Sequence, residues 1–259
     1  MAHRKSIPGA HPSTEVLTRG FDPRLSVGSA RPAVFRSSTY VFASPEAAER
    51  AFNLVSGRVQ PEPGEVPDLI YSRFNHPNAE ILEDQIVPLE EGAEWSIVFN
   101  SGMAAIMTSL MALLRPGDSF VYTVPLYGGT QNLIHDLLEP LGIVCRSVVS
   151  GQGAALDEAI RTTPNLKVVM IETPANPTMV MTDIKRAALT AANQPERPVI
   201  VVDNTFLGPA FQHPLTLGAD LVVYSATKYL GGFSDLLAGV VLGSSQELNK
   251  KIRGKRGLF

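Results

Sequence analysis

Three polar segments of this chain stand directly after short apolar runs, and their residue types could do chemistry together. Asp203 ends the run PVIVVD, and Lys228 follows the run DLVVYSA within YSATKYLGG. Ser101 follows WSIVF and opens the apolar stretch SGMAAI. A helix start binds phosphate, a buried carboxylate needs a cation or a donor such as a protonated pyridine nitrogen, and a neutral lysine amine forms an imine with an aldehyde. The three segments could therefore bind, respectively, a ring nitrogen, an aldehyde and a phosphate.

Each of these segments also has a purely structural interpretation. Ser101 could be only a helix cap, and Gly102 only a tight turn. Asp203 could cap the next turn through the backbone of DNTF. Lys228 could be a solvated surface lysine, as most lysines are. The residues by themselves leave both interpretations open.

The elements that must position these residues recur along the chain as short apolar runs separated by stretches of helical length. The runs lie at residues 95–99, 119–123, 144–149, 167–172, 198–203, 220–226 and 237–243, with helices expected at 102–114 and 183–193 among others. This alternation predicts an α/β fold in which helices cover both faces of a mainly parallel sheet. Ligands of such sheets bind beyond the carboxyl ends of the strands, so the polar residues after the runs should converge on one cleft.

The segment before the sheet has a different texture. The first forty or so residues are rich in Pro, Gly, Ser and Arg and predict an extended arm. A helix is expected near 45–55, followed by a surface loop at 56–69. We therefore divide the chain into an arm with its first helix (residues 1–60) and a large cofactor-binding domain (residues 61–259).

Composition excludes several other classes of function. The formal charge is −3 and no run of five like charges occurs, which argues against nucleic-acid or membrane-surface binding. No apolar run approaches the roughly 20 residues of a membrane helix, and no secretory signal follows the basic start, so we expect a cytoplasmic protein. Cys145 is the only cysteine and is expected to be a buried thiol, and the five scattered histidines suggest no metal site.

Motifs of other α/β enzymes are missing from the sequence. Neither GxGxxG nor GxxxxGK[ST] occurs, which argues against a dinucleotide-dependent dehydrogenase and a P-loop protein. The GxSxG motif of serine hydrolases is also absent, because Ser101 lies in NSGMA without the first glycine.

Six segments, taken in order, resemble the Cys/Met-metabolism family of pyridoxal-phosphate (PLP) enzymes. This family includes cystathionine γ-synthases, cystathionine γ-lyases, methionine γ-lyases and homoserine-ester sulfhydrylases. The matching segments are YSRFNHPN (71–78), SGMAAI (101–106), LYGGT (126–130), ETPANPT (172–178), VVDNTF (201–206) and YSATKYLGGFSD (224–235). The resemblance implies the large domain of the type I PLP-transferase fold, with pyridoxal 5'-phosphate as the cofactor.

The resemblance also implies roles for the residues that bind the cofactor. Lys228 matches the lysine that holds the cofactor covalently and then shuttles protons, and Asp203 matches the partner of the pyridine nitrogen. Four residues match those that bind the cofactor phosphate in the family. They are Gly102 and Met103, through their backbone amides, and Ser225 and Thr227, through their hydroxyls.

Four more residues have roles implied by the resemblance. Tyr127 matches the tyrosine that stacks on the ring and acts as an acid or base near the substrate. Asn176 matches a residue close to the ring hydroxyl and the substrate carboxylate. Tyr71 and Arg73 match a pair that reaches the phosphate of a neighbouring subunit. We therefore expect a homodimer or homotetramer with shared active sites, across which the N-terminal arm could lie.

The implied reaction is γ-elimination or γ-replacement on a sulfur amino acid or a homoserine ester, as in trans-sulfuration. Two positions depart from the family pattern: Gly129 stands where methionine γ-lyases carry a cysteine, and Phe233 where a histidine is common. Family members are also considerably longer, and their C-terminal domain supplies an arginine for the substrate carboxylate. We expect that domain to be absent here. The alternative function is therefore a truncated PLP-binding protein that oligomerises but is weakly active or inactive.

Overall fold

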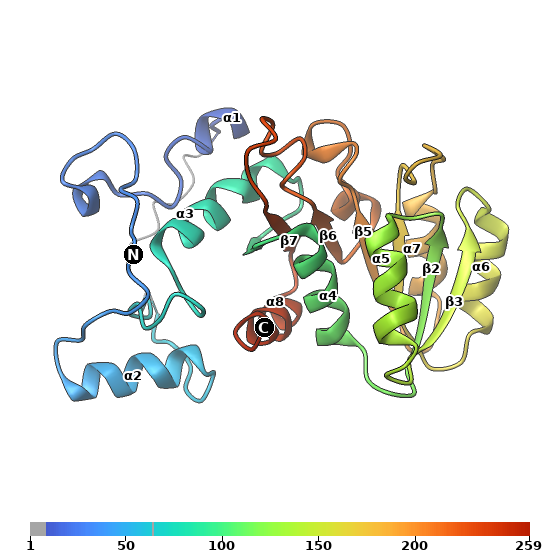
Figure 1. Cartoon of the computed structure of the whole chain (residues 1–259), viewed down its shortest axis with the longest axis horizontal. Coiled ribbons are helices and arrows are strands. Elements are labelled where there is room, and N and C mark those ends of the chain that lie inside the picture. The colour runs from blue at the N-terminus through green and yellow to red at the C-terminus, as the bar shows by residue number, and fades with distance from the viewer. Residues whose placement is uncertain (1–8, 64) are drawn as a thin grey trace. The chain divides into compact units, whose positions relative to one another are not determined.

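The computed structural model describes residues 9–63 and 65–259, and these form two compact units (Figure 1). The smaller unit contains the chain up to Leu89 together with Arg256–Phe259, and the larger unit contains Glu90–Lys255. The first eight residues of the predicted arm lie outside the described residues. The predicted boundary near residue 60 stays a prediction.

A seven-stranded sheet forms the framework of the larger unit, with strand order β1-β7-β6-β5-β4-β2-β3. The strands are β1 (Trp95–Phe99), β2 (Ser119–Val124), β3 (Val144–Val149), β4 (Leu166–Glu172), β5 (Val199–Asp203), β6 (Leu221–Tyr224) and β7 (Gly239–Gly243). Every apolar run that the sequence predicts as a strand is one, which confirms the α/β prediction. β7 is antiparallel to both of its neighbours, while the pairs β6-β5, β5-β4, β4-β2 and β2-β3 are parallel.

Helices cover both faces of this sheet because successive strand side chains point to opposite sides. On one face, Phe120 and Tyr122 pack with Leu110 of α4 (Gly102–Leu113) in a cluster that also contains residues of α8 (Gln246–Arg256). On the other face, Val121 packs with residues of α6 (Gly153–Thr162) and α7 (Ile184–Ala192). The expected helices at 102–114 and 183–193 are therefore confirmed as α4 and α7.

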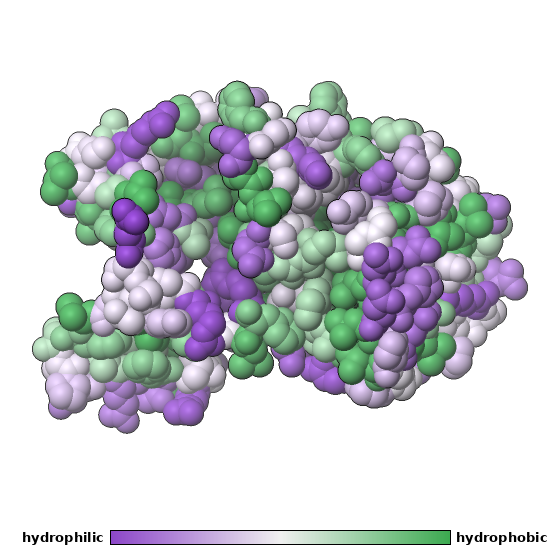
Figure 2. All heavy atoms as spheres, viewed as in Figure 1, coloured by the Kyte–Doolittle hydropathy of each residue, from purple (hydrophilic) through white to green (hydrophobic). Residues whose placement is uncertain are grey.

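The helical segment that follows β2 is amphipathic, with an apolar side that packs on the sheet and a polar side that faces solvent. It consists of α5 (Gly128–Leu133) and the π-helical turn η3 (Ile134–Leu138). Ile134 and Leu138 are fully buried against the sheet. Figure 2 shows a hydrophilic band where this segment lies, formed by its exposed residues Gln131, Asn132, His135, Asp136 and Glu139.

The smaller unit has helices but little other regular structure among its described residues. These are α1 (Pro12–Glu15), η1 (Pro23–Ser26), α2 (Pro45–Val55), α3 (Pro77–Ile86) and η2 (Val87–Leu89). Ser44 caps α2 by accepting a hydrogen bond from the amide of Ala47, and the helix expected near 45–55 is confirmed. The side chain of Asn78 binds the backbone of Ala33 and Phe35, which fixes part of the preceding irregular segment on α3.

Two short 3-10 turns, η4 (Gly208–Ala210) and η5 (Pro214–Leu217), complete the elements of the larger unit between β5 and β6. No helix in the described part of the chain is long and apolar enough to cross a membrane. Among the same residues, no three His, Cys, Asp or Glu side chains cluster so as to hold a metal ion. Cys145 is only partly buried, and its burial raises the pKa of the thiol to about 11.

The first residue of β7 approaches the start of α4 so closely that no side chain fits between them. A Cβ atom on Gly239 would overlap the carbonyl of Ser101 and lie 2.8 Å from the amide nitrogen of Gly102. Both obstacles are backbone, so no side-chain rotation can relieve the overlap. Glycine at 239 therefore sets where α4 begins relative to the sheet.

We expect the Gly239→Ala variant to lose about 3 kcal/mol or more of unfolding free energy, because the added methyl group forces backbone atoms apart. Gly254→Ala in α8 is the matched control, since a Cβ there meets nothing within 4 Å. Alanine in a helix is favoured over glycine by about 1 kcal/mol, so this variant should be slightly more stable than the wild type. Urea unfolding of the three proteins tests the prediction, and equal stability of the Gly239→Ala variant and the wild type would contradict it.

Candidate functional site

The carboxyl ends of six strands meet at one edge of the sheet. β1 and β6 are both antiparallel to β7, so β1 runs parallel to β6 and to the strands that follow it in the sheet. Ser101, Tyr127, Glu172, Asp203 and Ser225 therefore all lie at or just beyond this edge. The predicted convergence of polar residues after the apolar runs is thus reproduced by the topology.

The start of α4 combines a cap with free amide groups. The Ser101 hydroxyl accepts a hydrogen bond from the amide of Ala104 (3.1 Å), so the structural interpretation of Ser101 as a cap is correct. The amides of Gly102 and Met103 have no acceptor within the helix, as at every helix start. A Cβ on Gly102 would lie 2.8 Å from Cβ of Ser225, so glycine lets these two segments touch. The Ser225 hydroxyl is thereby held beside the free amides.

Asp203 is a buried carboxyl group with one oxygen engaged and one available. Its Oδ1 accepts hydrogen bonds from the amide (3.0 Å) and hydroxyl (2.6 Å) of Thr205, so the cap expected within DNTF is present. Its Oδ2 has no hydrogen-bond partner among the described residues. Burial raises the pKa of Asp203, and the bonds from Thr205 only partly offset this. A cationic donor next to Oδ2 would therefore strongly favour the carboxylate.

Glu172 connects two of the predicted site residues through their backbones. Its Oε2 accepts from the amide of Tyr127 (2.8 Å) and its Oε1 from the amide of Asn176 (2.7 Å). Glu172 is also the residue of β4 paired with Asp203 of β5. Burial and the charge of Asp203 raise the pKa of Glu172 to about 7, while the two amides act in the opposite direction.

The ring of Tyr127 lies against residues that follow it and against α4. A Cβ on Gly129 would lie 2.6 Å from Cε1 of Tyr127 and 3.1 Å from the sulfur of Met103. The Tyr127 side chain is 48% exposed, so much of the ring is accessible. The structure therefore places Tyr127 beside the start of α4, with Gly129 leaving the space that the ring occupies.

Lys228 lies in a tight turn after β6. Its amide donates to the carbonyl of Ser225 (3.0 Å), and its carbonyl accepts from the amide of Gly232 (2.8 Å). Its side chain is exposed, which both interpretations of this lysine allow. The Thr227 hydroxyl donates to the carbonyl of Ala238 (3.2 Å) and accepts from its amide, so its proton is already used in this conformation. The phosphate contact expected of Thr227 stays a prediction.

Tyr71 and Arg73 lie in the smaller unit. The Arg73 guanidinium stacks over the rings of Phe74 and Tyr71, at 4.5 and 5.5 Å from their centroids, and donates to the carbonyl of Gly257. Tyr71 also forms an isolated β-bridge with Thr39. Their expected role toward a neighbouring subunit stays a prediction.

Comparison with known proteins assigns this arrangement to a family. A sequence model for the Cys/Met metabolism PLP-dependent enzymes matches residues 13–257. The chain belongs to this family. The resemblance drawn from the six motifs is thus confirmed, and the cofactor predicted from them is the one on which the family depends.

Relatives of this family member are lyases and synthases of sulfur amino acids. L-Methionine γ-lyase from Pseudomonas putida is 39% identical over 95% of this chain and 58% of its own length. Cystathionine γ-lyase from Bacillus subtilis is 43% identical over 76% of this chain and 51% of its own length. The crystal structure of metB from Corynebacterium glutamicum superposes with a TM-score of 0.83 at 31% identity, covering 96% of this chain and 59% of that one. The chain therefore spans little more than half the length of these relatives.

The residues at the edge of the sheet fit the family's cofactor. The free amides of α4 and the Ser225 hydroxyl offer donors to a phosphate. The available oxygen of buried Asp203 offers an acceptor to a pyridine nitrogen. Lys228 is accessible to an aldehyde. Each part of the cofactor thus has a chemically matched group on this chain.

Sequence reasoning passed over two residues that the structure shows to organise the site. Glu172 was visible as a polar residue after a strand, but nothing in the sequence indicates which amides its oxygens accept. Gly239 lies within an apolar run, and only the three-dimensional contact with Ser101 shows why it is glycine. A close backbone approach leaves no pattern in a single sequence other than the glycine itself.

A second feature missed by sequence reasoning is a buried polar network next to Asp203. The amide nitrogen of the Asn204 side chain donates to the hydroxyl of Tyr224 (2.9 Å), and that hydroxyl donates to Glu90. The side chain of Gln212 donates to Asn204 (2.8 Å) and to the carbonyl of Thr173 (3.2 Å). The network therefore joins the segments that follow β4 and β5.

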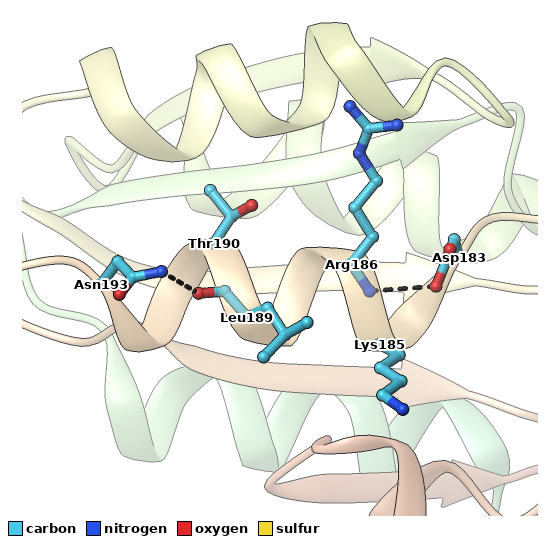
Figure 3. A pocket seen from close by; sticks show the side chains of 6 residues that line it. All are labelled: Asp183, Lys185, Arg186, Leu189, Thr190 and Asn193. Atoms are coloured by element: carbon cyan, nitrogen blue, oxygen red, sulfur yellow. Dashed lines mark hydrogen bonds between the residues drawn. The ribbon is translucent and has the colours of Figure 1, made fainter.

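A pocket elsewhere on the larger unit does not coincide with this site. It has a volume of about 450 Å³ and is lined by Asp183, Lys185, Arg186, Leu189, Thr190 and Asn193, all at or near α7 (Figure 3). The Arg186 side chain is already paired with Asp157 of α6 at 2.7 Å. None of the predicted site residues lines this pocket.

Glu90 is expected to make the stability of the larger unit depend on pH. Burial, more than any neighbouring charge, raises its pKa from 4.5 to about 7. A raised pKa means that the stabilisation is complete below the unfolded value and is lost as the pH rises through the folded value. Glu90→Gln, which mimics the protonated form, should remove up to about 3 kcal/mol of the loss between pH 5 and 8.

Thermal unfolding across this pH range measures the effect. Part of the pH dependence should persist in the variant, because the pKa of Glu172 is raised to a similar value. Glu158→Gln, at an exposed position of α6, is the control and should keep the full pH dependence. If Glu90→Gln and the wild type lose stability equally as the pH rises, the assignment of this pH dependence to Glu90 is wrong.

Proposed function

We propose that this chain acts in PLP-dependent trans-sulfuration, by γ-elimination or γ-replacement on a sulfur amino acid or a homoserine ester. The observation that carries the proposal is the meeting of three groups at one sheet edge in a member of the family: the free amides of α4, the available oxygen of Asp203 and the accessible Lys228. The names of the relatives, which include methionine and cystathionine γ-lyases, support this class of substrate.

Different residues of this chain would bind the cofactor and transfer the proton. When bound, the cofactor supplies an electron sink for the negative charge that develops at the substrate Cα. Asp203 holds the pyridine nitrogen protonated, and Gly102, Met103 and Ser225 hold the phosphate. Lys228 takes the proton from Cα and carries it onward. Thr227 adds its hydroxyl to the phosphate cradle if its bond to Ala238 opens.

Tyr127 and Asn176 would act on the substrate side of the ring. Tyr127, which is 48% exposed, would stack on the ring and donate or accept a proton near the substrate. Asn176 would contact the ring hydroxyl and the substrate carboxylate. Both roles rest on the matching motifs LYGGT and ETPANPT.

We also propose that the chain forms a homodimer or homotetramer with shared active sites. Tyr71 and Arg73 would then reach the phosphate held by a neighbouring copy. Large apolar side chains in the segment after Lys228 are exposed, which supports burial against a partner. They are Tyr229, Phe233, Leu236 and Leu237. A cytoplasmic location remains a prediction.

A second candidate function is a PLP-binding, oligomerising protein with little or no turnover. The chain spans 58% of the length of the methionine γ-lyase and 51% of the length of the cystathionine γ-lyase. In the family, the resemblance places the arginine that binds the substrate carboxylate in a C-terminal domain, which residues 13–257 of this chain do not match. Cofactor binding is common to both candidates, and turnover distinguishes them.

Attachment of the cofactor to Lys228 is the first prediction of the proposed function. The protein loaded with PLP should be yellow, and after borohydride reduction peptide mass analysis should find the adduct on Lys228. Lys228→Ala should lose both the colour and the adduct, whereas Lys185→Ala on α7 should keep them. An adduct confined to other lysines in a folded protein would contradict the proposal. Assays with cystathionine, methionine and homoserine esters then decide between turnover and binding alone.

Asp203→Asn should weaken retention of the cofactor about ten- to a hundredfold, because a hydrogen bond to a charged group contributes about 1.5–3 kcal/mol. Asp157→Asn is the matched control, since Asp157 is also buried but binds Arg186 and Thr190 on the outer helices. Equilibrium titration of each protein with PLP, followed by its visible absorbance, gives the affinities. Equal weakening by both variants would assign the effect to lost stability instead of to the ring nitrogen.

A further inference from the structure

Glu172 has a geometry that its place at the end of a strand does not require. It lies at the last position of β4, is 4% exposed, and accepts hydrogen bonds at both carboxyl oxygens, one from a distant backbone amide and one from an amide four residues further along its own segment. One amide belongs to Tyr127, after β2, and the other to Asn176, after β4. These are two residues to which the proposed function gives roles on the substrate side of the ring.

We propose that Glu172 is a positioning residue that sets the separation of Tyr127 and Asn176 through their backbone amides. The inference rests on the proposed function for what those two residues do. Its structural part, that one carboxyl group holds both segments, is independent of it. Among the described residues, the Glu172 side chain forms no hydrogen bond with the side chain of Tyr127 or with Lys228.

A carboxylate suits this task because two donors must be satisfied from one buried position. Both oxygens of a carboxylate accept hydrogen bonds, whereas the side-chain amide of glutamine has only one acceptor and would turn its own N–H groups toward the second amide. Water has little access to a site that is 4% exposed. The backbone of Glu172 is fixed in turn, because its amide donates to the Thr123 hydroxyl (3.2 Å).

The location of Glu172 argues against a role in stability alone. It is paired in register with Asp203, so two buried carboxyl groups stand on neighbouring strands, where their repulsion and desolvation are unfavourable. An apolar residue at this position would avoid that cost. Retaining an acid there is consistent with local strain at a functional site that the surrounding structure must offset.

Fixing the two backbones matters because the side chain of Tyr127 is itself weakly constrained. Tyr127 is 48% exposed, and the space beside its ring is left open by Gly129. If the backbone at 127 moved, the ring would lose its place beside the start of α4. Small displacements of groups around a reacting atom reduce rates steeply, and the supporting residues determine that precision.

Hydrogen exchange of the cofactor-free protein tests the inference directly. In Glu172→Gln, at least one of the two amides, Tyr127 or Asn176, should exchange about tenfold faster than in the wild type, because a buried bond to a charged acceptor is lost. Amides of the β2 and β4 interiors should be unchanged. Asp157→Asn is the control for removal of a buried carboxylate and should leave both amides protected. Unchanged protection of both amides in a folded Glu172→Gln protein would overturn the proposal.

The wild-type protein provides a second measurement in case Glu172→Gln does not fold. Protonation leaves Glu172 with one good acceptor oxygen, so acidification should lower the protection factor of at least one of the two amides, as in Glu172→Gln. Unchanged protection of both amides on acidification would contradict the proposal. Glu172→Asp keeps the charge but is shorter by one methylene, so it should retain the protection of at most one amide.

The loaded protein shows whether positioning matters to the site. If the proposed function holds, Glu172→Gln should still form the Lys228 adduct but give an altered visible circular dichroism of the bound ring, with kcat reduced more than KM is raised. If wild-type protein forms no adduct, the proposed function fails while the exchange result still decides the role of Glu172. If the adduct and its dichroism are unchanged in the variant, Glu172 does not position the site.

Discussion

The site depends on two buried carboxyl groups that the sheet places side by side on neighbouring strands. Glu172 and Asp203 end neighbouring parallel strands in register, and neither forms an ion pair with a lysine or arginine among the described residues. Glu172 is satisfied by two backbone amides, and Asp203 is satisfied on one oxygen only. The remaining oxygen of Asp203 is the group to which we assign the binding of a cationic ring.

Much of this arrangement follows from sequence pattern. Each of the seven apolar runs is long enough for one strand, and helical stretches between most of them require parallel crossovers, so a mainly parallel sheet could be predicted. The antiparallel direction of β7 was not part of that prediction. The same pattern predicts which polar residues gather at the edge, since they follow the strands directly. Asp203, Ser101 and Lys228 were found in this way from their positions alone, and the motifs then supplied the roles proposed for them.

The parts that could not be predicted depend on contacts between segments far apart in the chain. The acceptors of the Tyr127 and Asn176 amides, the closure of β7 onto Ser101, and the network from Glu90 through Tyr224 to Asn204 all involve side chains whose partners leave no local periodicity. Thr227 shows a related limit: its place beside Lys228 suggests a free hydroxyl, but the strand that returns at β7 supplies a nearer partner in Ala238.

The lack of a side chain at Gly129 makes room for the ring of Tyr127, so positions 127 and 129 should be considered together when relatives are compared. Any side chain at 129 begins with a Cβ that collides with the ring of Tyr127 and crowds the sulfur of Met103. A change at this position therefore acts first as a conformational change of the tyrosine, whatever reactivity the new side chain brings. Positions 127 and 129 are thus expected to be epistatic, and the effect of a residue introduced at 129 should depend on the conformation that Tyr127 adopts with it.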